Sequence, residues 1–183
     1  QPIIGAMLGV LRPGRPANAA QVHDWITLYA QDARGYDNIC ALVSMAHLDR
    51  PVEEVPHVTL DALEGRTDGV IALTAGGEGA LARLFAEDQP DAALAYAERL
   101  EALFPDRLYV EICRRLDPVE GKAEAALLDL AYDRGLPLVA TNPTCFTEPH
   151  FHEAHDVMLC IADSAYVDTA DRRRSSPDAW MKP

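Results

Sequence analysis

The sequence predicts an α/β fold in which parallel strands alternate with helices. Short apolar runs that end in turn residues recur along the chain, and between them lie segments whose apolar residues repeat with helical spacing. Strands that alternate with helices pair in parallel through right-handed crossovers. The carboxyl ends of the strands should therefore lie together at one side of the sheet, and side chains that do chemistry are expected there.

Five apolar runs have the length and the flanking turn residues of buried strands. In the fourth run, apolar residues alternate with a second set that includes Glu111, so one face of that strand carries a carboxylate. The predicted strands are 3–11, 25–30, 68–77 with its closing glycine turn, 107–115 and 136–142.

Helical spacing marks the segments between these runs. One helix is expected to follow Gly35, two more flank Pro90, and a fourth should end at Arg134 because Gly135 follows it. A last helix is predicted to begin near Thr147, with a buried stripe on one face. The stripe consists of Phe151, Ala154, Met158 and Ile161.

Composition predicts a single soluble domain spanning 1–183. No 20-residue apolar run is present, which argues against a membrane span. The formal net charge of −13 should repel phosphate backbones, so we expect little direct DNA binding. Four cysteines without a Cys-x-x-Cys pair or a signal peptide indicate reduced thiols and a cytoplasmic location. The chain opens inside a predicted strand without an initiator methionine, and we interpret it as a piece of a longer protein.

The segment 138–162, LVATNPTCFTEPHFHEAHDVMLCIA, raises the question of a metal site. His152 and His155 are three residues apart, not the four of a His-Glu-x-x-His metallopeptidase, although this spacing still puts them on one helix face. The favoured interpretation is that they flank the buried stripe and make hydrogen bonds. Cys145 near His150 is too little to define a nucleophile. Glu111 is either a site carboxylate or a structural hydrogen-bonding group.

Two other segments are weaker candidates. The glycine turn AGGEGA, residues 75–80, lacks both the dinucleotide fingerprint and the ending of a P-loop, and its acidic residue would repel an anion. A tight turn is the preferred interpretation. The basic run DRRR, residues 171–174, is typical of a solvated turn.

Several runs in order along the whole chain carry a family resemblance. GVIALTAGGEGALARL, FPDRLYVEICRR, RGLPLVATN, HEAHDVMLCIADS and DRRRSSPDAWMKP resemble the PHP domain of bacterial DNA polymerase III alpha subunits, in the alphaproteobacterial form. The resemblance implies a partial, distorted (β/α)7 barrel with parallel strands at its core and its first strand-helix units missing. It also implies that residues 171–183 lead toward the polymerase core, and that the parent protein is a DNA-directed DNA polymerase acting in DNA replication.

The resemblance also assigns the positions where active family members bind divalent metals. Those positions hold Met7, Trp25, Gly76, Pro143 and Cys145 in this sequence. The first histidine pair of the family would lie before residue 1. The resemblance therefore implies a vestigial metal site with no catalytic residue, metal or other cofactor, in a domain that scaffolds the rest of the alpha subunit and docks the proofreading exonuclease subunit.

Two alternatives stay open at this point. One is a metal-dependent phosphoesterase in which Glu111, Cys145, His152 or His155 form an unusual site. The other is a structural interaction module unrelated to replication. A further expectation concerns 3–11, which would lack a strand partner on one side and could pair with a second copy as a homodimer.

Overall fold

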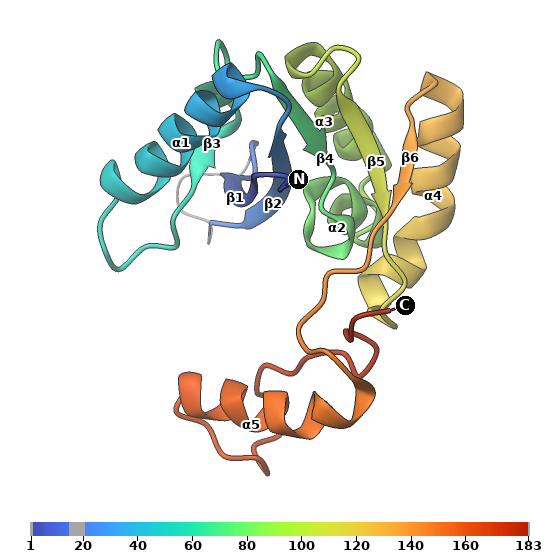
Figure 1. Ribbon diagram of the computed structural model, residues 1–183. Coiled ribbons are helices and arrows are strands. Elements are labelled where there is room, and N and C mark those ends of the chain that lie inside the picture. The colour runs from blue at the N-terminus through green and yellow to red at the C-terminus, as the bar shows by residue number, and fades with distance from the viewer. Residues whose placement is uncertain (1, 15–20, 183) are drawn as a thin grey trace.

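The computed structural model describes residues 2–14 and 21–182. Six strands form one sheet in the order β3-β1-β2-β4-β5-β6, with helices packed beside it (Figure 1). The strands are β1 Gly5–Leu11, β2 His23–Ala30, β3 Val58–Thr59, β4 Val70–Leu73, β5 Leu108–Ile112 and β6 Leu138–Ala140. The predicted α/β class is confirmed, and the arrangement is consistent with a partial barrel.

Parallel pairing holds for most of the sheet but needs one correction. β1 pairs with β3, β4 with β5, and β5 with β6 in parallel, whereas β2 runs antiparallel to both β1 and β4. Only residues 12–22 separate β1 from β2. A parallel crossover needs a dozen or more residues, so the chain has to turn back on itself here.

The predicted helices are present with small shifts at their ends. They are α1 Ala33–Leu48, α2 Ala80–Ala86, α3 Pro90–Leu103, α4 Pro118–Arg134 and α5 His152–Ala162, with short 3₁₀ turns η1 Leu60–Leu63, η2 Gly76–Glu78 and η3 Pro149–Phe151. Asp117 caps α4 by accepting hydrogen bonds from two backbone N–H groups of its first turn. Gly135, at φ 65°, ends the same helix, as its sequence position predicted.

The pairing register divides the sheet into two faces. Leu8 lies opposite Ile26, and Leu28 lies opposite Ala72, and all four are buried together with the apolar sides of helices α1 to α4. The other face carries the alternate residues of the same strands. Its members include Met7, Trp25, Thr27, Leu73, Tyr109 and Glu111. The candidate site must be built on this second face because the first is filled by the core.

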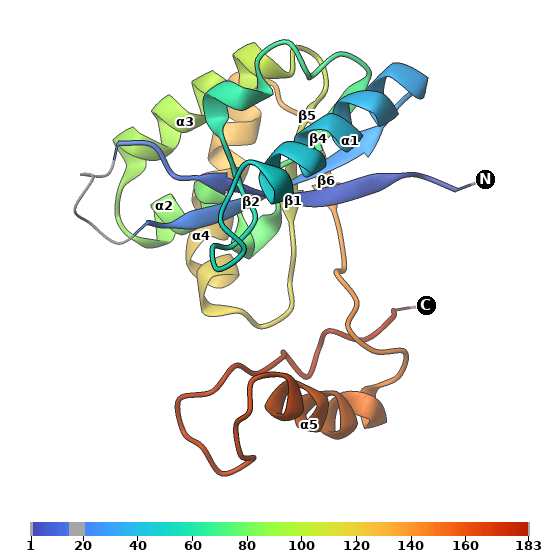
Figure 2. The same cartoon turned by 90° about the vertical axis from the view of Figure 1, so that its left-hand side faces the viewer.

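Helix α5 and the segment after it lie apart from the sheet in both views (Figures 1 and 2). Two hydrogen bonds tie this region to the strand ends: Asn142 Nδ2 donates to the Trp180 carbonyl at 2.8 Å, and the Ser176 hydroxyl donates to the Arg115 carbonyl. No helix in the described part of the chain is long and apolar enough to cross a membrane.

The buried stripe predicted for the last helix is wrong. Phe151, Ala154, Met158 and Ile161 are all exposed, with 66% of Met158 and 74% of Ile161 accessible to solvent. The opposite side of α5 faces the protein instead, and it carries His152, His155, Asp156 and the buried Cys160. Helical spacing identified the apolar face correctly, but it could not determine what, if anything, covers that face.

Candidate functional site

A polar cluster lies at the carboxyl ends of β5 and β6. Glu111, on β5, is 4% exposed, and its backbone N–H donates to the hydroxyl of Thr74 at 2.9 Å. Thr141, just after β6, donates its single hydroxyl proton to Glu111 Oε1. The hydroxyl oxygen of Thr141 lies 3.1 Å from the Cys113 sulfur, so the thiol is the donor in that contact. The cluster therefore joins two neighbouring strands through one carboxylate oxygen.

The cluster has little capacity for chemistry in this arrangement. Burial, reinforced by the neighbouring carboxylates, raises the pKa of Cys113 to about 11, even though the Thr141 hydroxyl acts in the opposite direction. Cys113 is thus a neutral thiol at physiological pH and a poor nucleophile. The second oxygen of Glu111, Oε2, is buried and makes no hydrogen bond to the protein.

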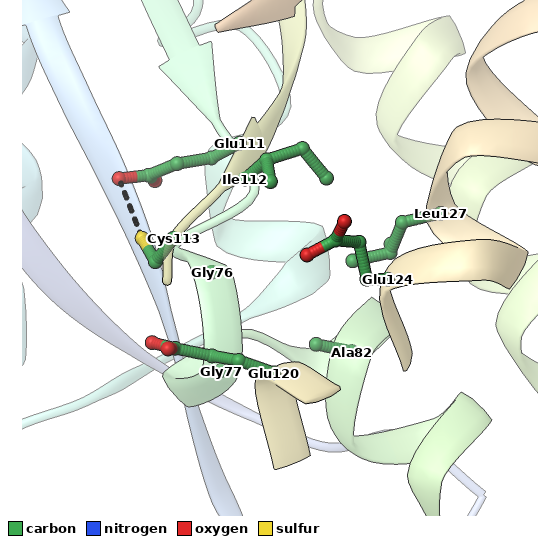
Figure 3. A pocket seen from close by; sticks show the side chains of 9 residues that line it. All are labelled: Gly76, Gly77, Ala82, Glu111, Ile112, Cys113, Glu120, Glu124 and Leu127. Carbon is green, nitrogen blue, oxygen red and sulfur yellow. Dashed lines mark hydrogen bonds between the residues drawn. The ribbon is translucent and has the colours of Figure 1, made fainter. Parts of the chain in front are cut away.

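Figure 3 shows the small cavity beside this cluster, with Glu111 and Cys113 pointing toward each other and Glu120 and Glu124 projecting from α4. Its volume is about 10 Å³, which is close to the minimum that holds one water molecule. A phosphate ester does not fit into it. The lining residues are Gly76, Gly77, Ala82, Glu111, Ile112, Cys113, Glu120, Glu124 and Leu127.

Glu120, the other deeply buried carboxylate of the cavity, is already bound. Its two oxygens accept hydrogen bonds from the backbone N–H, Nε and Nη2 of Arg115 at 2.7 to 2.9 Å. The Glu120 side chain is 5% exposed and that of Arg115 is 14% exposed. Both guanidinium donors bind Oε1 and the backbone N–H binds Oε2, so the charge of Glu120 is paired with that of Arg115 inside the protein.

Gly76 is one of the positions that the family resemblance assigns to a metal ligand. Its φ is +49°, and a Cβ atom built on it would lie 2.6 Å from the sulfur of Cys113. Cys113 therefore occupies the space that a side chain at position 76 would need. A side chain at position 76 would require the Cys113 thiol to move, and the positive φ favours glycine there.

Met7 and Trp25 share the sheet face of Glu111 but donate no lone pair suited to a hard cation. Met7 is 46% exposed and lies opposite Thr27. Trp25 is half-buried, lies opposite Gly9, and forms a bridge to Gly79 next to the η2 turn. The structure thus places Trp25 near the glycine turn that contains Gly76.

Pro143 and Cys145 follow β6 on the surface. Both are exposed, and the backbone N–H of Cys145 donates to the Ala179 carbonyl at 2.8 Å. The segment that contains Cys145 is therefore hydrogen-bonded to the C-terminal residues. These two positions lie at the carboxyl end of β6, as the resemblance predicted for the site.

The three histidines near α5 bind protein groups. His152 Nε2 donates to the Ser175 carbonyl at 3.1 Å, and a 2.9 Å hydrogen bond joins His155 Nδ1 to the Ser175 hydroxyl. His150 lies on the surface beside Glu148. Within residues 2–14 and 21–182, no three His, Cys, Asp or Glu side chains are grouped so that they could hold a metal ion.

Two features of the site region were missed by sequence reasoning. Thr141 lies in the segment 138–162, and its role was not predicted because an isolated threonine carries no ligand or nucleophile pattern. Arg12, 9% exposed, and Asp24, 1% exposed, form a buried ion pair at the carboxyl end of β1 and the start of β2. No spacing rule could have found a pair joined across two strands, because the contact depends on the antiparallel register.

These features are those of an α/β domain whose sheet is consistent with a partial barrel, with polar groups at the carboxyl ends of its parallel strands. Residues 1–115 match the family model described as the PHP domain. The chain therefore belongs to the PHP domain family.

Relatives extend the match beyond the family model. The DNA polymerase III subunit alpha of Caulobacter vibrioides is 39% identical over the whole chain, which covers 16% of that protein. The corresponding subunit of Rickettsia prowazekii is 32% identical over 86% of the chain, and that of Rickettsia bellii is 31% identical over all of it, covering 13% and 15% of those proteins. The chain thus spans about one sixth of the length of these relatives, and the expected resemblance is confirmed.

Proposed function

We propose that this chain is the PHP domain of a DNA polymerase III alpha subunit and acts there as a scaffold without metal-dependent hydrolase activity. The observation that carries the proposal is the set of residues at the five ligand positions. A thioether, an indole, a glycine and a proline offer no donor to a cation that prefers nitrogen and oxygen, and the fifth position, Cys145, is exposed on a surface segment.

The neighbouring groups support the same conclusion. Glu111 and Glu120 accept hydrogen bonds from Thr141 and Arg115, so these carboxylates stabilise the strand ends. Glu111 retains one oxygen without a protein partner, but the adjoining cavity has room for a water molecule only. The alternative, a phosphoesterase built from Glu111, Cys145, His152 or His155, would need His152 and His155 to leave Ser175.

Metal content tests this proposal directly. We expect the purified chain, after dialysis against metal-free buffer, to carry far less than one equivalent of Zn²⁺, Mn²⁺ or Fe by elemental analysis. Near-stoichiometric metal that is lost in His152→Ala but kept in His150→Ala would overturn the proposal. His150 is the matched control because it lies on the surface beside Glu148.

The activity of the parent protein and its partners belong to the same proposal. DNA-directed DNA polymerase activity would reside in the part of the relatives that this chain does not cover, and docking of the proofreading exonuclease subunit follows from the resemblance alone. With its charge of −13, the chain by itself should bind duplex DNA weakly at physiological salt. It should show no polymerase, exonuclease or phosphatase activity, and it should reside in the cytoplasm. Tight duplex binding with a steep salt dependence would contradict this part.

Self-association through β1 is a separate proposal. β3 pairs with Val10 and Leu11 only, so within the described residues the earlier part of β1 has a strand partner on one side alone. Ile4 and Met7 are about half exposed beside that open side. An open apolar strand is a template for pairing with a second copy.

Light scattering at micromolar concentration tests for this homodimer. Ile4→Lys and Met7→Lys should yield a monomer, whereas Leu48→Lys on α1 should leave the dimer intact. Leu8 is unsuitable for this purpose because it is buried in the core. A monomer in the unsubstituted chain would refute the proposal.

A further inference from the structure

Helix α5 is held in place by its polar side. Asp156 binds Arg172 through two hydrogen bonds of 2.5 and 2.6 Å, and the Arg172 side chain is 3% exposed. The rings of His152 and His155 lie 5.7 and 5.6 Å from the ring of the buried Phe146. These contacts, with those to Ser175, fix which face of α5 points outward.

The outward face is apolar. Val157 is 44% exposed, Met158 66% and Ile161 74%, and Ala154 lies one turn before them. The positions follow the i, i+3, i+4, i+7 spacing of a single helical stripe. Phe151 before the helix is also exposed. We call the five residues Phe151, Ala154, Val157, Met158 and Ile161 the α5 stripe.

An exposed contiguous apolar patch on a folded domain marks an interface. The α5 stripe differs from scattered surface leucines because the same helix has turned its hydrogen-bonding side chains inward. The geometry points to the α5 stripe as the surface by which this domain packs against the remainder of a DNA polymerase III alpha subunit. This inference rests on the proposed function and adds to it the contact surface.

Two observations select that occupant. The PHP family model ends at residue 115, before α5, yet the Caulobacter and Rickettsia bellii subunits match the whole chain and are about six times as long. Residues 116–183, which contain α5, are therefore shared with long polymerase subunits and lie outside the part matched by the PHP model.

Charge around the stripe favours the same partner. Residues 148–174 contain six carboxylates and three arginines, and Asp156 and Asp163 bind two of those arginines, Arg172 and Arg173. Glu153 is exposed on α5 next to Ala154 of the stripe, and Asp168 and Asp171 are exposed in the segment after the helix. A polypeptide that handles DNA carries basic surface, which complements an apolar patch on an acidic segment. A second copy of this acidic chain would place like charges against each other.

Hydroxyl-radical footprinting tests the assignment. The 183-residue chain is compared with a chimera in which this sequence replaces the 184 matched residues of the Caulobacter subunit. We expect labelling of Met158 and Ile161 to fall several-fold in the chimera. Leu48 on α1 and Tyr132 on α4, which are 80% and 76% exposed, should label equally in both.

A variant provides the second measurement. Met158→Lys together with Ile161→Lys should lower the thermal midpoint of the chimera and leave that of the 183-residue chain unchanged, whereas Leu48→Lys should change neither. If the chimera does not fold, the Caulobacter subunit replaces it in the experiment. The positions that match Met158 and Ile161 are then footprinted both in the intact Caulobacter subunit and in its isolated 184-residue segment.

Three outcomes would overturn the inference. In the first, the α5 stripe is labelled to the same extent in the folded chimera as in the 183-residue chain. In the second, the stripe becomes protected only at high concentration of the 183-residue chain, which would indicate contact with a second copy. In the third, the stripe becomes protected only when the exonuclease subunit is added. None of these readouts depends on metal content, so failure of the inference can be distinguished from failure of the proposed function.

Discussion

Replacing Arg12 with methionine should destabilise the protein by about 3 kcal/mol, the lower end of the range for breaking a buried ion pair. Arg12 Nε and Nη2 donate to the two oxygens of Asp24 at 2.7 and 2.8 Å, and Nη1 donates to Glu87 at 2.7 Å. The hydrogen bonds that Arg12 donates to Asp24 raise the pKa of Arg12 above its already high ordinary value, so the guanidinium stays charged. Without it, Asp24 is buried with Arg83 as its remaining charged partner, which is why we expect the lower end of the range.

Urea unfolding followed by tryptophan fluorescence measures this loss. Arg34→Met, which removes an exposed pair with Asp68 in which the arginine is 71% exposed, is the matched control and should cost less than about 1 kcal/mol. Arg12→Met combined with Asp24→Leu should recover much of the lost stability, because no buried charge is then left without its partner. A loss below about 1 kcal/mol for Arg12→Met alone would mean that the pair behaves like a surface contact, and would refute the reasoning.

Three further predictions follow from other contacts. Thr141→Val should lower the unfolding free energy by about 1 to 3 kcal/mol, because Glu111 loses its hydroxyl donor while still buried, and added Zn²⁺ in calorimetry should not restore it. Gly79→Ala should cost about 1 to 3 kcal/mol, since its Cβ would lie 1.7 Å from a backbone oxygen; an unchanged thermal midpoint would contradict this. Arg172 holds the pKa of Asp156 below its ordinary value, so the stabilisation is present above the unfolded-state pKa and is lost as pH falls through the lowered folded-state pKa. Asp156→Asn should be less stable at neutral pH and lose less on acidification, as thermal midpoints across that range would show.

Most helices and strands were located from local sequence signals, because helix ends and apolar spacing depend only on residues that are close together in the sequence. Pro90 and Gly135 mark helix ends in the structure as they do in the sequence. The antiparallel direction of β2 corrects the predicted parallel pairing, because apolar alternation is the same for a strand running either way. The predicted strands 3–11 and 25–30 leave room for a parallel crossover, and only the observed start of β2 at His23 makes the connection too short for one.

The candidate site was predicted in part. The sequence placed Glu111 on a strand and the segment after 138 at a strand end, and both are there. The pairing of Glu111 with Thr141 and Cys113 required the register of β5 and β6, which joins residues about thirty positions apart.

By itself, the sequence determined the α/β class, the approximate bounds of the helices and the acidic charge, because each of these is a property of residue type and local spacing. Tertiary structure decided which groups meet: the buried Arg12–Asp24 pair across β1 and β2, the thiol of Cys113 filling the space beside Gly76, and the outward apolar face of α5. The physical reason is that burial and hydrogen bonding depend on contacts between distant segments. A helical pattern predicts which residues share a face, but only packing determines whether that face is covered.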